Sequence, residues 1–509
     1  MDDVRDEDRG PGGGPDRDAG AAPEAATAYG RVRGRLSERG VASFLGVPYA
    51  APPVGPLRFA PPAPPQAWTG VREAVAFGPT PPKAAYQPPM DALLPEHSVP
   101  GEDVLSLNVW TPSPGPAARL PVMVWLYGGA FANGSSSTPA YDGTAFARDG
   151  VVFVSVNYRL GADGFAHLEG VPDNRGLLDQ VAALEWVRDN IAGFGGDPDR
   201  VTLFGESAGA MAIGVLLGQE RARGLFHRAI LQSGAAHHFL RPASARLITA
   251  RLAEKLGVPP TAEGIAGAGY PELLAAQGEL RGEIGARPDP RLWGEAALNA
   301  MPFEPVTEGP ALPGPECGVR LLVGSNREEY RLFLVPTGRL DAFAEDKLRA
   351  MALAYGLDPD KGLDVYREAR PGAGAGELLD AVATDWFYRI PAIRLAESVP
   401  GSYAYEFAWR SPRFDGRLGA CHAVELPFVF DRLRDPLYAP MIGERAPQAL
   451  ADAVHGAWVA FATTGDPGWA PYDTETRATM VFDDGPGGAG PGVVADPRGR
   501  ERELWEGVR

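Results

Sequence analysis

Residues 205–209 have the sequence Gly-Glu-Ser-Ala-Gly and fit the pattern G-x-S-x-G. A short apolar run, residues 201–204, precedes them, and small residues continue after them to Ala212. A strand, a tight turn and a helix in this order would expose the hydroxyl of Ser207 at the apex of the turn. Glycine suits both flanks because a side chain there would crowd the turn. The segment predicts a nucleophilic serine, which requires a base, an acid and oxyanion donors elsewhere in the chain.

The base is expected far beyond the serine, because α/β hydrolases carry their site in the order serine, acid, histidine. Of the seven histidines, His422 and His455 leave enough chain for an acid on a separate strand. His455 belongs to a predicted helical stretch and is interpreted as a surface or packing residue. His422 belongs to a predicted loop, which suits a base that must reach across the edge of a sheet. We therefore favour His422.

The acid is expected at the carboxyl end of a strand, where sites of open α/β sheets lie. Glu328 and Glu329 both follow a predicted strand at residues 319–323, and their spacing does not distinguish them. Residues 125–131, Trp-Leu-Tyr-Gly-Gly-Ala-Phe, end another predicted strand with a turn of small residues. Backbone N–H groups of such a turn could bind an oxyanion. The turn parallels the HGGG-type motif, with Tyr in place of His and Ala130 in place of the last Gly.

The elements that would position these residues alternate between strand and helix. Continuous apolar runs predict strands buried on both faces, as in a parallel sheet. Leu177, Val181, Leu184, Val187 and Ile191 recur at helical spacing. Strands are predicted at residues 105–110, 121–127, 151–157, 200–204, 229–232 and 319–323, and a helix at 207–217. This alternation predicts an α/β protein with a mostly parallel sheet.

Composition excludes several classes of protein. The 509 residues carry a formal net charge of −17, which disfavours binding to nucleic acid or to anionic membrane surfaces. The apolar runs are too short to span a bilayer. Cys317 and Cys421 are too few for a disulfide framework or a cysteine zinc site. Residues 1–28 lack the apolar core of a secretory signal and are expected to form a disordered acidic tail, so a cytoplasmic location is expected.

Many runs of this chain resemble the type-B carboxylesterase family, and they occur in the family's order. They include residues 44–59, 102–110, 125–131, 157–165, 174–210, 229–234, 324–329 and 419–430. The resemblance extends from about Gly30 to Asp484, nearly the whole chain. It implies an α/β-hydrolase fold in a single catalytic domain, residues 29–509. Matches are weakest at about 235–301 and 332–383, which are expected to be insertions that shape the substrate site.

The resemblance also implies roles for individual residues. Ser207 matches the nucleophile, Glu329 rather than Glu328 matches the acid, and His422 matches the base. Oxyanion donors fall on the backbone N–H groups of Gly129, Ala130 and Ala208. Glu206 and Ser233 are expected to support the site, Ser233 through a hydroxyl that helps to hold the acid. Arg159 with Asp179, and Arg58 with Glu102, are expected to form structural ion pairs.

Two departures from the family concern an early loop. Many members close this loop with a disulfide, whereas Pro81 and Val104 occupy the corresponding positions here. The loss of both half-cystines agrees with a reducing location. Cholinesterases also bind choline with a Trp of this loop, where the present chain offers Tyr86 nearby. A quaternary-ammonium site is therefore poorly supported.

These residues together predict a serine carboxylesterase that cleaves small esters through an acyl-enzyme, without a metal or an organic cofactor. Activity is expected to fall as His422 protonates, at a pH of about 6 to 7. The alternatives are a carbamate, lactone or amide hydrolase with the same residues, or a non-catalytic binding protein of the same fold. A monomer or a homodimer is expected. Cys421, beside His422, is a candidate site for inactivation by thiol reagents.

Overall fold

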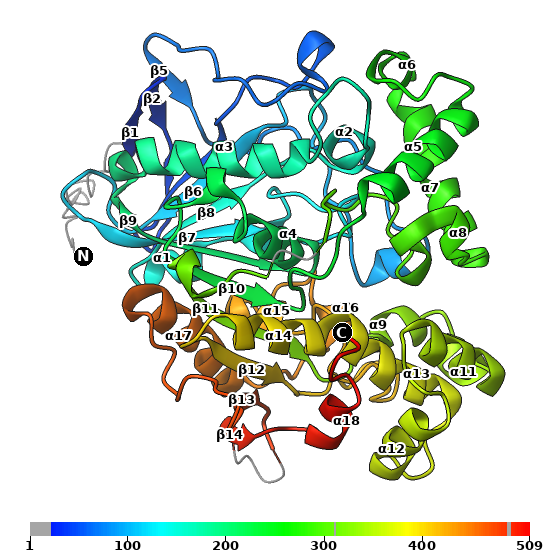
Figure 1. The fold of residues 1–509 in the computed structure, drawn as a ribbon. Coiled ribbons are helices and arrows are strands. Elements are labelled where there is room, and N and C mark those ends of the chain that lie inside the picture. Colours follow the sequence, from blue (N-terminus) through cyan, green and yellow to red (C-terminus); the bar gives the residue numbers. More distant parts are fainter. Residues whose placement is uncertain (1–21, 310–311, 486–489) are drawn as a thin grey trace, which may run out of the picture.

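A large twisted sheet forms the centre of the computed structural model, which describes residues 22–309, 312–485 and 490–509. Its strands are β3 (Arg35–Leu36), β4 (Ala42–Pro48), β6 (Ser106–Thr111), β7 (Leu120–Leu126), β8 (Val152–Val156), β9 (Gly196–Glu206), β10 (Arg228–Gln232), β11 (Arg320–Asn326), β12 (Tyr403–Phe407), β13 (Ala478–Phe482) and β14 (Gly492–Ala495). The order across this 11-stranded sheet is β14-β13-β12-β11-β10-β9-β7-β8-β6-β4-β3 (Figure 1). Neighbours from β8 to β13 are parallel. This topology confirms the predicted α/β-hydrolase fold.

Helices pack against the sheet between consecutive parallel strands. They include α3 (Arg175–Asn190), α4 (Ala208–Leu216), α14 (Ile390–Ser398) and α17 (Gln448–Thr464). Helix α4 lies very close to the sheet because its first turn consists of small residues. A Cβ atom added at Gly209 would lie 2.0 Å from the carbonyl oxygen of Leu126. Glycine at this position is therefore required by the approach of α4 to β7.

Aromatic side chains fill the core beneath the central strands. The rings of Trp125 on β7 and Phe204 on β9 lie 4.9 Å apart. Phe146 stacks on Phe153 of β8 at 5.3 Å, and Phe430 packs edge-on against Trp125 at 5.1 Å. Each of these rings is essentially inaccessible to solvent. Their burial explains why the sequences of β7, β8 and β9 are continuously apolar rather than alternating.

The N-terminal region departs from its expected boundary. Residues 1–21 of the expected tail lie outside the described residues. Glu24–Thr27, however, forms strand β1, which pairs with β2 (Gly30–Arg33) in a small sheet that also contains β5 (Val71–Glu73). The N–H of Ala28 donates a hydrogen bond to Asn190 Oδ1 at 2.7 Å. The tail therefore cannot extend to residue 28, because hairpin pairing already orders the chain from Glu24.

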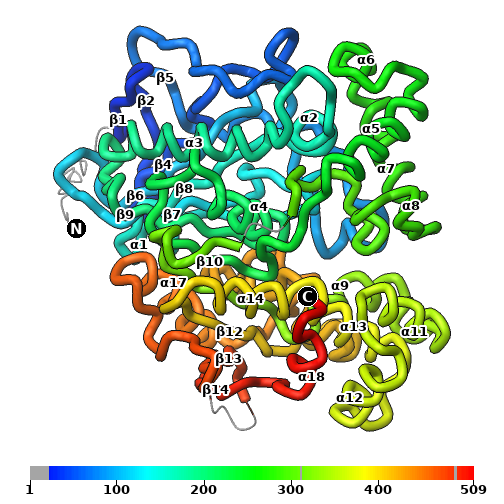
Figure 2. The backbone as a smooth tube through the Cα atoms, viewed as in Figure 1, coloured from blue at the N-terminus to red at the C-terminus, as the bar shows by residue number. Residues whose placement is uncertain are grey.

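The two regions predicted to be insertions are largely helical. The first contains α5 (Pro242–Leu256), α6 (Ala262–Ala266), α7 (Tyr270–Ala286) and α8 (Pro290–Trp293). The second contains α9 (Arg331–Leu334), α10 (Arg339–Ala342), α11 (Glu345–Ala354), α12 (Lys361–Ala369) and α13 (Ala375–Thr384). Both groups lie on the right of the sheet in Figures 1 and 2. No helix in the described part of the chain is both long and apolar enough to cross a bilayer.

The register of the parallel strands brings the predicted site residues to one edge. Leu126 on β7 aligns with Gly205 on β9, and Gln232 on β10 aligns with Glu206 on β9 and Gly324 on β11. The segments that follow these strands therefore emerge side by side. They contain the Gly-Gly-Ala turn, the serine turn and the Glu328–Glu329 pair.

Candidate active site

Ser207 occupies the sharp turn between β9 and α4. Its backbone has φ 54° and ψ −123°, a combination that residues with a side chain rarely adopt. Hydrogen bonds hold the turn on both sides: Ser207 N–H donates to Gln232 O at 2.9 Å, and Met211 N–H donates to Ser207 O at 2.8 Å. This strained turn presents the side chain of Ser207 to a cavity, as a nucleophile elbow requires.

His422 lies in the loop between β12 and α15 (Leu426–Val429), and its imidazole lies between two carboxylates. Its Nδ1 atom is 2.7 Å from Glu329 Oε2, and its Nε2 atom is 3.0 Å from Glu206 Oε1. The backbone N–H of His422 also donates to Glu329 O at 3.1 Å. The structure thus places Glu329 against the imidazole of His422, and His422 lines the same cavity as Ser207.

The two adjacent glutamates of the acid loop point in different directions. Glu329 is fully buried, and its Oε1 accepts a hydrogen bond from Asn326 N–H at 2.7 Å. Glu328 instead accepts from Ala420 N–H at 2.9 Å and forms ion pairs with Arg331, at 2.9 Å, and Arg410. Only Glu329 of the pair contacts the imidazole, so the geometry favours it as the acid.

Carboxylates around the His422 imidazole raise its pKa. Burial would lower the pKa of His422, but the charges of Glu206 and Glu329 outweigh burial and raise it to about 9. Burial, partly offset by the charge of His422, raises the pKa of Glu206 to about 8. The expected protonation of His422 at about pH 6 to 7 took no account of a second carboxylate at Nε2, where the structure places Glu206.

The Gly-Gly-Ala turn faces the start of α4. Gly129 has φ 122°, and a Cβ atom there would lie 2.3 Å from Asn133 O. Ala130 has φ 53°, in the left-handed region that disfavours side chains. Among the described residues, the N–H groups of Gly129 and Ala130 have no backbone acceptor, and Ala208, the first residue of α4, has none within its helix. These N–H groups remain available for an oxyanion.

A cavity of about 560 Å³ opens above Ser207 and His422. Its walls are mostly apolar and come from the Pro-rich early loop, from α7, and from the segments around Phe303 and Phe333. Parts of both regions expected to be insertions, α7 and the segment around Phe333, therefore line the cavity. Tyr86 of the early loop also lines the cavity. No cluster of metal-ligating side chains occurs within residues 22–309, 312–485 and 490–509.

A polar network behind the imidazole was not predicted. Glu425 is fully buried and accepts hydrogen bonds from Gln232 Nε2 at 3.1 Å and from Asn326 Nδ2 at 2.6 Å. Trp458 Nε1 donates to Gln232 Oε1 at 3.0 Å. Burial raises the pKa of Glu425. The sequence feature that could have indicated this network is Glu425, which follows His422 by three residues within the family-like run of residues 419–430.

Some supporting contacts differ from expectation. Ser233 is fully buried, but its hydroxyl has no hydrogen-bond partner among the described residues, so the expected bond to the acid is not formed. The acid is held by Asn326 N–H instead. Arg58 pairs with Asp163 at 3.1 Å rather than with Glu102, because Asp163 on α2 (Gly161–Phe165) lies closer.

Other expectations agree with the structure. Arg159 and Asp179 form a buried ion pair at 2.7 Å. Cys317 and Cys421 are both free thiols. His455 is a buried packing residue, with Nδ1 2.7 Å from Val429 O and its ring against Phe146.

Known proteins are similar to this chain over nearly its whole length, in sequence and in fold. A carboxylesterase family model matches residues 21–487. A para-nitrobenzyl esterase of Bacillus subtilis (strain 168) is 39% identical over 486 residues, covering 90% of this chain and 94% of that protein. A phenmedipham hydrolase of Pseudarthrobacter oxydans is 36% identical over 495 residues, covering 91% and 95%. A Geobacillus stearothermophilus carboxylesterase structure aligns with a TM-score of 0.79 at 37% identity, covering 95% of this chain and 99% of that one.

The sheet topology and the serine turn define an α/β hydrolase. The comparisons assign the chain to a family within this class, because the family model and the similar proteins match nearly the whole chain. The chain belongs to the carboxylesterase family and is a carboxylic ester hydrolase.

Proposed function

We propose that the enzyme cleaves esters in two steps through an acyl group on Ser207. The Ser207 hydroxyl attacks the ester carbonyl while its proton moves to His422 Nε2. The imidazolium then gives this proton to the leaving alcohol, and the C–O bond of the ester breaks. A water molecule repeats the sequence: its proton passes to His422, its oxygen attacks the acyl carbon, and Ser207 recovers its proton as the acid leaves.

The supporting groups form no covalent bond with the substrate and instead stabilise the charges that develop during the reaction. Glu329, 2.7 Å from Nδ1, orients the imidazole and stabilises its charged form. The N–H groups of Gly129, Ala130 and Ala208 form the oxyanion hole and stabilise the negative charge that develops on the carbonyl oxygen. Glu206 is a supporting residue at Nε2. The observation that carries this proposal is the alignment of Glu329 and His422 at the cavity that Ser207 lines.

The cavity supports esters with an apolar acyl or alcohol group. Its walls are mostly apolar, and its volume of about 560 Å³ is in the range of sites for drug-sized ligands. Esters are favoured over amides because an alkoxide leaves more readily than an amine. The same residues could also attack carbamates and lactones. A panel of para-nitrophenyl esters with increasing acyl length, paired with the matching anilides, tests this choice. We expect kcat/KM for each ester to exceed that of its anilide, and the reverse order would favour the alternative.

Removal of the nucleophile tests the mechanism itself. Ser207→Ala is expected to lower kcat by a factor on the order of 10⁵–10⁶, if the three residues act as a unit. A variant that keeps most of its ester hydrolysis would exclude Ser207 from the reaction. A wild-type protein that hydrolyses none of the panel and is not labelled by a fluorophosphonate would favour a non-catalytic binding role.

We also propose a cytoplasmic location and a monomeric or homodimeric state. The free thiols Cys317 and Cys421 support a reducing compartment. Cell fractionation tests the location, and light scattering on the purified protein tests the assembly. Recovery in an extracellular fraction, or a tetrameric mass, would contradict these two proposals respectively.

A further inference from the structure

A turn of π-helix, Asp385–Arg389, lies between α13 and α14, next to the candidate base. The N–H of Ile390 donates to Asp385 O, five residues earlier, and all five side chains of the turn are buried. Such turns insert one extra residue into a helix and frequently accompany functional sites. The insertion changes the direction of the side chains that follow it, so the turn determines where Phe387 and Tyr388 point.

Pro391 explains why the helix departs from α geometry here. Proline has no N–H and cannot donate to the carbonyl group of Phe387, four residues earlier. Other parts of the chain supply the missing donors. His238 Nε2 donates to Phe387 O at 2.7 Å, and Arg509 Nε donates to the neighbouring Trp386 O at 3.1 Å. The π-helical turn is thus stabilised by these tertiary hydrogen bonds rather than by helix propensity.

The turn places Tyr388 against the face of the His422 imidazole. The two ring centres are 4.8 Å apart and their planes are inclined by 34°. This distance is within the range of favourable offset aromatic pairs. Phe333 contacts the same imidazole at 5.7 Å, and Phe387 packs on Tyr388 at 4.6 Å. Glu329 is hydrogen-bonded to Nδ1 of His422 and Glu206 lies 3.0 Å from Nε2, whereas Tyr388 contacts the face of the ring.

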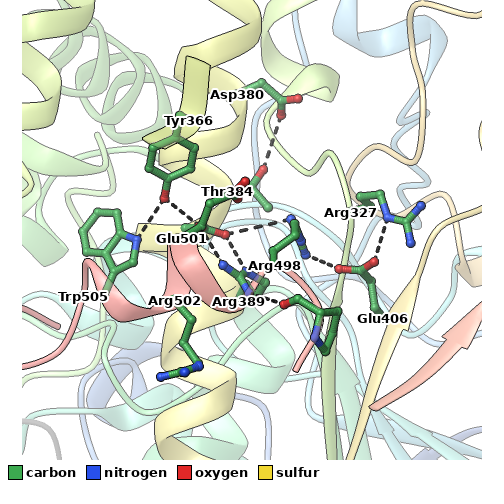
Figure 3. A network of polar contacts seen from close by, with 12 residues as sticks. Arg327, Tyr366, Asp380, Thr384, Arg389, Glu406, Arg498, Glu501, Arg502 and Trp505 are labelled. Carbon is green, nitrogen blue, oxygen red and sulfur yellow. Dashed lines mark hydrogen bonds and ion pairs between the residues drawn. The ribbon is translucent and has the colours of Figure 1, made fainter. Parts of the chain in front are cut away.

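A buried polar network holds the turn (Figure 3). Asp385 accepts hydrogen bonds from Arg389 Nε and from Tyr366 OH, both at 2.6 Å. Trp505 Nε1 in turn donates to Tyr366 at 2.9 Å, and Arg389 Nη1 donates to Pro497 O at 3.1 Å. Asp385 and Tyr366 are completely buried. These contacts fix both ends of the π-helical turn.

The same network reaches the acid loop. Arg498 forms an ion pair with Glu406, and Glu406 Oε1 accepts from Arg327 Nε at 2.7 Å. Figure 3 shows Arg498 between the turn and Glu406. Arg327 precedes Glu329 by two residues, and its N–H donates to Phe407 O at 2.9 Å. One polar network therefore connects the segments of Glu329 and Tyr388. Glu329 contacts the edge of the imidazole, and Tyr388 contacts its face.

We propose that the π-helical turn is a positioning element, whose Tyr388 ring holds the His422 imidazole in its working orientation and stabilises it when it is charged. This inference rests on the proposed function, because it requires His422 to accept the proton of Ser207. The positive charge that then develops lies under the face of Tyr388. An aromatic face within about 6 Å of a cation attracts it, and the attraction is stronger where water is excluded.

Three variants test the positioning role. Tyr388→Leu removes the aromatic face, Tyr388→Phe retains it, and Tyr355→Leu is the matched control. Tyr355 is a buried tyrosine that stacks on Trp386 of the same turn at 4.4 Å. We expect Tyr388→Leu to lower kcat about 10-fold with KM changed less than 2-fold. Tyr388→Phe should stay within 2-fold of wild type, and Tyr355→Leu should lower stability while leaving the pH profile unchanged.

The pH profile separates positioning from simple packing. Glu206, Glu329 and Glu425 are the charged groups around His422, from β9, the acid loop and the start of α15, and all three stay in place in these variants. Loss of the aromatic face should make the charged imidazole less stable, so the acid limb of kcat/KM should move to lower pH in Tyr388→Leu alone.

An unshifted limb in Tyr388→Leu, with kcat within 2-fold of Tyr355→Leu, would overturn the inference. If Tyr388→Leu does not fold, Tyr388→Met replaces it, because the flexible thioether side chain fills irregular gaps without an aromatic face. Ser207→Ala is assayed alongside. Activity that survives in Ser207→Ala would overturn the proposed function. If Ser207→Ala is inactive but Tyr388→Leu and Tyr355→Leu have equal pH profiles, only the positioning role is overturned.

Discussion

The Nε2 atom of His422 lies 3.0 Å from a carboxylate oxygen of Glu206, the residue directly before the nucleophile. In the proposed mechanism, Nε2 is also the atom that accepts the proton of Ser207. An ionised Glu206 therefore favours the imidazolium form, which cannot act as a base. In that mechanism, deprotonation of the imidazole must weaken this contact before each attack.

This contact predicts an acid limb at unusually high pH. The carboxylates of Glu206 and Glu329 outweigh burial and raise the pKa of His422 to about 9. Because the base must be neutral, kcat/KM should fall as the pH decreases from about 9, and little activity should remain at pH 6. Glu206→Gln removes one negative charge and should move the limb down by about one unit or more. A pH–rate profile with the same limb in wild type and Glu206→Gln would contradict this account.

The two neighbouring glutamates offer a direct comparison. Glu329 contacts Nδ1 of the imidazole at 2.7 Å, whereas Glu328 faces Arg331 and Arg410. Glu329→Gln should lower kcat by about 10²-fold or more, because the imidazole loses its orienting charge. Glu328→Gln, the isosteric control, should lower it less than 10-fold. Steady-state kinetics of both variants with one activated ester decide the question, and equal losses would make the assignment of the acid wrong.

Ala130 should carry measurable strain. Its φ of 53° is in the left-handed region, where a Cβ atom is unfavourable. Ala130→Gly should raise the free energy of unfolding by about 0.5–1 kcal/mol and keep ester hydrolysis, because the backbone N–H remains. Ala132→Gly, two residues later at ordinary φ, should lower the free energy by a similar amount. Urea denaturation compares them, and destabilisation by Ala130→Gly would argue against strain at this turn.

Cys421 should be far less reactive than its position beside His422 indicated. Its side chain is completely buried, and burial together with the charge of Glu329 raises the pKa of its thiol well above the usual range. Cys317 is only partly buried. A disulfide reagent should therefore modify Cys317 in the folded enzyme with little loss of activity. Cys421 should react only after unfolding, and rapid inactivation that Cys421→Ala prevents would refute this expectation.

The sequence predicted the parts of the site that depend on strand ends. The apolar runs before Ser207 and before the Glu328–Glu329 pair define β9 and β11, and parallel pairing brings their carboxyl ends together. Ordering along the chain was enough to favour His422 over His455. The spacing of Glu328 and Glu329 did not show which of them is the acid, because the direction of each side chain depends on the turn after β11. The family resemblance implied Glu329, which the geometry also favours.

Contacts between distant side chains were not predictable in the same way. Glu206 lies next to Ser207 in the sequence, yet its approach to Nε2 depends on where the His422 loop crosses the sheet. Tyr388 belongs to a helical segment whose period is altered by Pro391 and by a bond from His238. Such contacts depend on tertiary packing, which neither periodicity nor motif spacing encodes.

The central claim is that Ser207 becomes covalently acylated with the help of His422. The most direct measurement is the site of reaction with a fluorophosphonate, read by mass spectrometry of the intact protein and its peptides. We expect one adduct per chain, located on the peptide that contains Ser207, absent in Ser207→Ala and much slower to form in His422→Ala. A stoichiometric adduct on Ser207→Ala, or an adduct on another residue of the wild-type enzyme, would contradict the account.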